Sequence, residues 1–191
     1  MSAGSRTVED VRKLLTSCQA ADSQQRMKFY DSWAETYEQD TLMMQYRATH
    51  LAVDLLSANV SENREAVQVL DVACGSGRVA QLMVERGFQH FVGVDGSRGM
   101  LDQAAKTGLY QELKLALLGT EPLPAQPGAF DVVVLVGALD PGFAPVSVVR
   151  ELCHAAKPGP PAARSRLCVR DTVVTAPPGG RGGFTPGAYE A

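Results

Sequence analysis

The chain has 191 residues, of which 45% are hydrophobic and 20% charged, and its net charge is −3. This is the composition of a soluble globular domain, and the small negative charge predicts neither a nucleic-acid partner nor an anionic membrane surface. No apolar run approaches the ~18 residues of a membrane span. The four cysteines are scattered without a Cys-x-x-Cys pair, which disfavours a metal site or a disulfide framework and favours a reducing compartment. We therefore expect a cytoplasmic monomer without a metal, and a nuclear location stays open.

Three helices are predicted in the first 60 residues. Apolar residues recur at helical spacing over residues 7–19, 28–37 and 46–58. In the second segment Phe29, Trp33 and Tyr37 recur every four residues, so they share one face of a continuous helix. We expect residues 1–25 to be an N-terminal helical extension of the domain that follows.

From residue 67 onward, short apolar runs alternate with helical patterns. Strands are predicted at residues 67–72, 91–94, 113–118 and 130–136. Helices are predicted at residues 78–86, 100–106 and 146–156. The run at 132–136 is continuously apolar, as expected for a strand buried on both faces of a parallel sheet. The alternation predicts an α/β fold, with a Rossmann-like, doubly wound and mostly parallel sheet.

The last 35 residues differ in composition. Residues 157–191 contain six Pro and six Gly, and only residues 167–174 have strand-like content. This segment therefore supplies at most one more strand. We place the main domain at residues 26–175 and expect residues 176–191 to be a disordered, Pro/Gly-rich tail.

The most informative motif is residues 69–77, VLDVACGSG. An apolar strand ends in Asp71, Gly75 and Gly77 then open a helix, and Asp95 ends the next apolar run. The pattern G-x-G-x-x-A, followed by an acid about 20 residues on, predicts a nucleotide-binding βαβ unit. The alternative is a turn that only connects strand to helix and binds no ligand.

Asp71 bears on which ligand is bound. A carboxylate at the strand end would repel a pyrophosphate resting on the helix N-terminus, so it disfavours NAD. S-adenosylmethionine has no phosphate. Its ammonium and sulfonium suit an acid, and the amides of the glycine loop can receive its carboxylate. We therefore predict S-adenosylmethionine as the cofactor and keep an NAD-dependent oxidoreductase as the less favoured alternative.

The chain resembles class I S-adenosylmethionine-dependent methyltransferases. The resemblance rests on residues 29–37, 69–77, 93–101, 130–139 and 157–159. They are similar, in that order, to a cofactor lid, the first and second sequence motifs, the fourth strand and the turn before the fifth strand. The resemblance covers roughly residues 26–159 and implies the class I methyltransferase fold. In that fold the last two strands form an edge hairpin. Since residues 157–191 of this chain supply at most one more strand, we expect its C-terminal strands to be incomplete.

The resemblance also implies a set of cofactor-binding residues: Tyr30, Trp33, Asp71, Ala73, Gly75, Gly77, Asp95, Gly96, Ser97, Met100, Gly119, Thr120, Val136 and Gly137. Asp71 and the glycine loop would hold the methionyl end, and Asp95 would accept hydrogen bonds from both ribose hydroxyls. Two positions depart from the family pattern. Ala73 replaces a common glycine, which is tolerable if φ is negative there. Gly119 replaces a common aspartate, which leaves recognition of the adenine amine to backbone groups.

The function expected from these features is methyl transfer from S-adenosylmethionine to a small-molecule or protein acceptor. No side chain stands at a position that the chemistry marks for a catalytic base, so the catalytic residues stay unassigned. The altered C-terminus motivates a different class of function as the alternative: a protein that binds S-adenosylmethionine without turnover.

Overall fold

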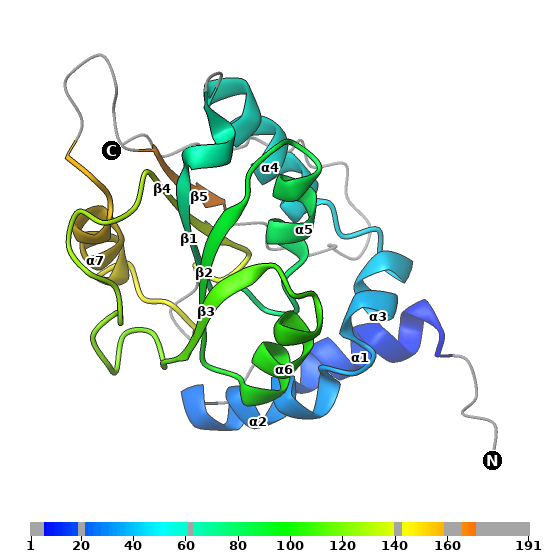
Figure 1. The fold of residues 1–191 in the computed structure, drawn as a ribbon. Helices are drawn as coiled ribbons and strands as arrows, with labels where there is room; N and C mark the ends of the chain where they lie inside the picture. Colours follow the sequence, from blue (N-terminus) through cyan, green and yellow to red (C-terminus); the bar gives the residue numbers. More distant parts are fainter. Residues whose placement is uncertain (1–5, 19–21, 61–62, 140–142, 159–165, 171–191) are drawn as a thin grey trace, which may run out of the picture.

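The structure is a computed structural model that describes residues 6–18, 22–60, 63–139, 143–158 and 166–170 (Figure 1). Its helices are α1 (Val8–Cys18), α2 (Ser23–Trp33), α3 (Tyr37–Met43), α4 (Ala48–Asn59), the single 3-10 turn η1 (Arg64–Ala66), α5 (Arg78–Val84), α6 (Arg98–Lys106) and α7 (Val148–Ala155). Its strands are β1 (Gln68–Val72), β2 (His90–Asp95), β3 (Tyr110–Leu115), β4 (Val132–Val136) and β5 (Arg166–Arg170).

The five described strands form one parallel sheet in the order β3-β2-β1-β4-β5. The order reverses between β1 and β4, because the chain leaves β1 in one direction to β2 and β3 and returns to β4 on the other side. Parallel open sheets bind ligands at such a switch point, beyond the carboxyl ends of the strands. The predicted α/β, Rossmann-like parallel sheet is therefore confirmed.

Alternation along β1 and β4 divides the core between the two faces of the sheet. Val69, Val132 and Val134 pack with α4 and α5 on one face. Leu70 and Leu135 pack with α7 on the other. Figure 1 shows α7 alone on its side of the strands, with α4, α5 and α6 on the opposite side. Because β1 continues this alternation, Asp71 faces the side that α5 and α6 cover.

Helices α1 and α4 match the predictions for residues 7–19 and 46–58, and the prediction of one continuous helix over residues 28–37 is wrong. The predicted helix over residues 28–37 ends at Trp33, and a turn precedes α3 at Tyr37. The Trp33 and Tyr37 rings nevertheless pack edge to face, 4.8 Å apart. A turn followed by a new helix thus preserves the contact that the four-residue spacing predicted, while the direction of the chain changes.

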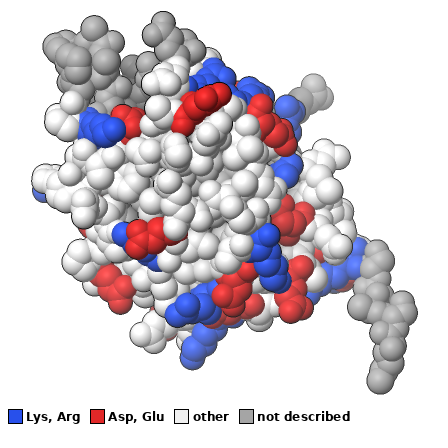
Figure 2. Space-filling view, in the orientation of Figure 1, with Lys and Arg blue, Asp and Glu red and all other residues white. Residues whose placement is uncertain are grey.

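The third strand lies earlier than predicted, at Tyr110–Leu115 instead of residues 113–118. As the last strand in the sheet order, it exposes Gln111 and Glu112 to solvent, so its polar residues hid its start. β5 covers Arg166–Arg170, and the tail predicted at residues 176–191 lies outside the described residues. On the face shown in Figure 2, acidic and basic side chains are interspersed.

Candidate functional site

A cavity of about 270 Å³ lies at the switch point of the sheet. Its floor is formed by residues 73–76 after β1 and by Val136 and Gly137 at the end of β4, and its walls by residues of α3 and α4 and the turn between them. The structure therefore brings four of the predicted site residues, Ala73, Gly75, Val136 and Gly137, around one cavity. Tyr46 closes one side, since a Cβ on Gly137 would collide with its hydroxyl.

Asp95 lies beside this cavity at the carboxyl end of β2 and is 9% exposed. Its Oδ2 accepts a hydrogen bond from the Gly75 amide at 2.8 Å, and its Oδ1 accepts one from the Ser97 amide at 2.8 Å. Burial raises the pKa of Asp95, although these amides act in the opposite direction. A carboxylate can accept about four hydrogen bonds, so both oxygens keep capacity for ligand hydroxyls.

Asp71 lies at the carboxyl end of β1 and is 1% exposed. Its Oδ2 accepts a hydrogen bond from the Tyr110 hydroxyl at 2.7 Å. Burial raises the pKa of Asp71 to about 7; the Tyr110 hydroxyl lowers it, and the charge of Asp95 raises it further. A cation placed beside Asp71 would favour its ionised form. Asp71 does not itself line the cavity, but it lies two residues before Ala73, which does. An ammonium group placed there would suit this acid, and a phosphate would not.

The glycine loop departs from the expected backbone at Ala73. Its φ is +55°, so the condition under which an alanine would be tolerated here without strain, a negative φ, is not met. Gly75 (φ +55°) and Gly77 (φ +90°) share the left-handed conformation, which glycine adopts without strain. An alanine pays about 1–2 kcal/mol for it. The loop holds this shape because the Cys74 and Gly75 amides bond to Val94 O and Asp95.

The segment after β2 is fixed by α2. Ser97 caps α6 by accepting from the Met100 amide, and its hydroxyl donates to Asp31 Oδ1 at 2.6 Å. The Gly99 amide donates to the same oxygen at 2.9 Å. Met100 is buried in the same contact, and Met27 lies against Gly96. Gly96, Ser97 and Met100, all predicted to flank the adenine, thus line the junction between α2 and the carboxyl end of β2.

The predicted aromatic residues lie in a cluster on α2. Tyr30 packs against Trp33, with 5.8 Å between ring centroids, and against Phe143 at 5.3 Å. Trp33 is 3% exposed and donates its Nε1–H to Asp40 at 2.7 Å. Trp33 therefore joins α2 to α3 and does not line the cavity.

Gly119 and Thr120 lie farther from the cavity. Both are exposed, and Gly119 approaches Pro145. The Thr120 hydroxyl donates to the carbonyl of Leu117. The structure does not bring these two residues into the cavity with the others.

Sequence reasoning missed three residues of this site. Tyr110 reaches Asp71 from β3, the Glu38 carboxylate accepts a hydrogen bond from the Ser76 hydroxyl, and Tyr46 covers Gly137. No local motif marks them, because each acts on a residue more than 35 positions away in the sequence.

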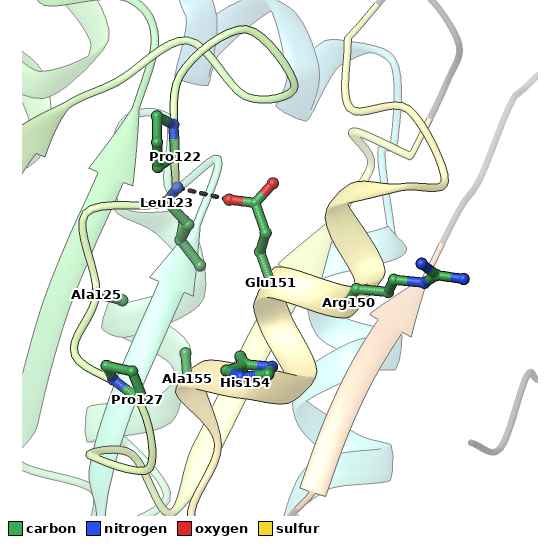
Figure 3. Close-up of a pocket in the computed structure, with 8 residues that line it drawn as sticks. All are labelled: Pro122, Leu123, Ala125, Pro127, Arg150, Glu151, His154 and Ala155. Carbon is green, nitrogen blue, oxygen red and sulfur yellow. Dashed lines mark hydrogen bonds between the residues drawn. The ribbon is translucent and has the colours of Figure 1, made fainter.

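A second cavity, of about 240 Å³, lies on the α7 face between that helix and residues 122–127 (Figure 3). There Glu151 accepts a hydrogen bond from the Leu123 amide at 2.6 Å and ties the loop to α7. None of the predicted site residues lines it. In the part of the chain that the structure describes, no group of three or more His, Cys, Asp or Glu side chains could hold a metal. No helix within the same residues is long and apolar enough to cross a membrane.

Comparison with known proteins agrees with this geometry. Residues 69–159 match the family described as Methyltransferase domain. The chain is 49% identical over 138 residues to Methyltransferase-like protein 27 of Homo sapiens. The aligned region covers 72% of this chain and 56% of the relative. It is 37% identical over 100 residues to Ubiquinone biosynthesis O-methyltransferase of Albidiferax ferrireducens, over 48% of this chain and 38% of the relative. The chain thus spans about half the length of these relatives or less.

A solved structure shares the fold. An S-adenosylmethionine-dependent methyltransferase from Leishmania major superimposes with a TM-score of 0.53 and 16% identity, over 78% of this chain and 65% of that chain. The parallel sheet and the cavity at its switch point match the fold of class I methyltransferase domains. Over residues 69–159 this chain is similar to such domains, whose cofactor is S-adenosylmethionine.

The residues present fit that cofactor. Asp95 offers oriented carboxylate oxygens for two hydroxyls, and Asp71 lies nearby for a cation. Among the described residues, nothing lies within 4 Å of the place that a Cβ on Gly75 would take, so a ligand can approach this backbone closely.

Proposed function

We propose that this chain is a methyltransferase that transfers the methyl group of S-adenosylmethionine to a small-molecule or protein acceptor. The observation that carries the proposal is Asp95, whose two oxygens are held by the Gly75 and Ser97 amides beside the switch-point cavity. We further propose the fourteen site residues of the sequence analysis as the cofactor site, within a domain over residues 26–175. The proposal also includes a monomer located in the cytoplasm or nucleus, without a nucleic-acid partner.

Bound S-adenosylmethionine supplies a methyl group already activated by a sulfonium. The task left to the protein is to bind, to orient and to exclude water. Asp95 would hold the ribose hydroxyls and Asp71 the ammonium, while the glycine loop would receive the carboxylate. Helices α3 and α4 wall the cavity over this loop, and the Glu38–Ser76 hydrogen bond joins α3 to it. An acceptor would enter between these helices, where Tyr46, Thr49 and His50 line the cavity.

Ligand-induced stabilisation tests the cofactor directly. The purified chain is melted with S-adenosylhomocysteine and, in parallel, with NAD. A ligand at about 100 times its dissociation constant stabilises the native state by about 2.7 kcal/mol, which corresponds to a shift of several degrees. We expect the shift with S-adenosylhomocysteine only. A shift with NAD alone would contradict the proposal.

Two variants of Asp95 test the assignment of the site. Asp95→Ala removes the acceptor for the ribose hydroxyls, and Asp95→Asn keeps its shape while it removes the charge. We expect both to lose the thermal shift. The matched control is Asp102→Ala, on the exposed side of α6, which should keep it. Retained affinity for S-adenosylhomocysteine in both Asp95 variants would remove Asp95 from the site.

Transfer of a labelled methyl group from S-adenosylmethionine into a cell extract separates an enzyme from a binder. Incorporation that disappears with Asp95→Ala supports turnover, and the labelled fraction, small molecule or protein, identifies the acceptor class. A chain that binds S-adenosylhomocysteine and labels nothing would favour the alternative of binding without turnover.

A further inference from the structure

We propose that Tyr110 is a positioning residue of the cofactor site: its hydroxyl holds the Asp71 carboxylate in the orientation and ionisation state that bind the ligand's ammonium. This inference rests on the proposed function and extends it to a residue that no sequence motif marks. The proposal implies that the affinity for S-adenosylhomocysteine depends on pH, and that the Tyr110 hydroxyl determines the pH at which the affinity changes.

The hydrogen bond crosses an entire strand. Tyr110 begins β3 and Asp71 lies on β1, with β2 between them, yet Tyr110 Oη lies 2.7 Å from Asp71 Oδ2. The path is open because β2 has a glycine at this point: Asp71 pairs with Gly93 in the sheet. A Cβ on Gly93 would lie 2.9 Å from Cε1 of the tyrosine ring and 3.0 Å from Cys74 Sγ. Gly93 therefore makes room for the tyrosine and for Leu113, whose Cδ2 would lie 2.6 Å from the same Cβ.

The other side of the ring is closed by the start of α5. A Cβ on Gly77 would lie 3.2 Å from Cε2 of Tyr110, and the same position is 3.5 Å from Ala104 and Thr107 of the α6 region. Phe91 packs against the ring edge to face, at 6.2 Å between centroids. A ring enclosed on so many sides has few alternative rotamers, so its hydroxyl stays directed at Asp71.

Three other groups that can ionise surround the Tyr110 hydroxyl: Asp71, Asp95 of β2 and Cys74 of the glycine loop. The charges of Asp71 and Asp95 disfavour each other, and both raise the pKa of the Cys74 thiol, which burial raises first. Tyr110 is the group that stabilises the ionised form of Asp71, since its hydroxyl donates a hydrogen bond to the carboxylate. Without that donor, Asp71 would be protonated at neutral pH and would lose its attraction for an ammonium group.

The test is Tyr110→Phe, which removes only the hydroxyl. The affinity for S-adenosylhomocysteine is measured from pH 5.5 to 8 by calorimetry or by the fluorescence of Trp33, the single tryptophan. In the wild-type chain we expect the affinity to weaken as the pH falls through about 7, where Asp71 takes up a proton. Hydrogen bonds to charged groups are the stronger ones, so the variant should show the same change at a pH about one unit higher and about fivefold weaker binding at pH 7.

A double-mutant cycle with Asp71→Asn separates positioning from general structural damage. Asn at this position cannot ionise, so adding Tyr110→Phe to D71N should change neither the affinity nor its remaining pH dependence, which then belongs to Asp95. If the hydroxyl contributes only to packing, its removal has the same effect with and without D71N. Additive effects would overturn the inference.

A second measurement does not depend on ligand binding. Carbon-13 NMR of labelled aspartate side chains follows the titration of Asp71 in the ligand-free chain, and the Asp71 pKa should be higher in Tyr110→Phe than in the wild type. An unchanged pKa would overturn the inference even if the variant binds more weakly. If the wild-type chain does not bind S-adenosylhomocysteine at pH 8, the proposed function itself fails, which is a different result from either.

Discussion

Asp71→Asn should stabilise the ligand-free protein, and by an amount that depends on pH. The Asp71 pKa is about 7 in the folded chain, compared with 3.8 for an ordinary aspartate. Because the folded state holds its proton more tightly than the unfolded state, the wild-type chain loses stability as the pH rises from 3.8 to about 7. Asparagine resembles the protonated acid at every pH and avoids this loss.

The magnitude follows from the two pKa values. One pKa unit corresponds to about 1.4 kcal/mol. Folding raises the Asp71 pKa from 3.8 to about 7, so above pH 7 this acid lowers the free energy of unfolding by about 4 kcal/mol. At pH 5 the pH has risen only about one unit past the ordinary value, so the cost there is under about 2 kcal/mol. Such a cost is a large part of the stability of a domain this size. The proposed role of the carboxylate, to bind the ligand's ammonium, gives a reason for this cost in the wild type.

The assay is urea denaturation of wild type and D71N at pH 5 and pH 8, followed by Trp33 fluorescence. Asp95 is present in both chains, so its own contribution cancels in the difference, apart from the repulsion between its charge and that of Asp71, which D71N also removes. We expect D71N to gain about 2–3 kcal/mol more at pH 8 than at pH 5. Saturating S-adenosylhomocysteine should reduce the gain, since the ligand favours the ionised acid. An equal difference in unfolding free energy at the two pH values would refute a raised Asp71 pKa.

Two further substitutions test the backbone of the site. Ala73→Gly should raise the unfolding free energy by up to about 1 kcal/mol, because glycine relieves the positive φ of +55°; a loss of stability in urea would contradict the strain assigned to this residue. Gly93→Ala should lower the unfolding free energy by about 1–3 kcal/mol, since its Cβ would lie 2.6 Å from Leu113 and 2.9 Å from Tyr110. In the background of Tyr110→Ala the same substitution should be less damaging, and an unchanged penalty would mean that Leu113 alone sets it.

Much of the fold could be predicted from the sequence because the central strands are buried on both faces. Residues 132–136 are continuously apolar, and in residues 68–72 only Gln68 and Asp71 are polar, so both runs show which segments form the middle of a parallel sheet. β3 lies last in the sheet order and exposes polar residues, so the apolar pattern placed it three residues too late. The break after Trp33 was hidden for a different reason: residues four apart contact each other both in a helix and across this turn.

The positions of Asp71, Asp95 and the glycine loop could also be predicted, since strand ends and glycines are local features. What surrounds them could not. Glu38 contacts Ser76 of the loop across 38 positions of sequence, and Tyr110 contacts Asp71 across 39 positions. Neither Glu38 nor Tyr110 lies in a motif. The φ of Ala73 depends on hydrogen bonds that the loop makes with β2 and its end, at Val94 and Asp95. Such contacts depend on the tertiary fold, so spacing along the chain does not reveal them.

The glycines of this edge serve different purposes although the motif treats them alike. Gly77 and Gly93 are small because the Tyr110 ring passes between them, and Gly137 is small because Tyr46 lies against it. Above Gly75 the described residues leave open space. A side chain on Gly75 would therefore obstruct the ligand, whereas one on Gly77 or Gly93 would displace Tyr110 and disturb Asp71. The G-x-G pattern thus combines Gly75, which the proposed ligand would require, with Gly77, which the protein's own tyrosine requires. This tyrosine links the shape of the loop to the charge of Asp71.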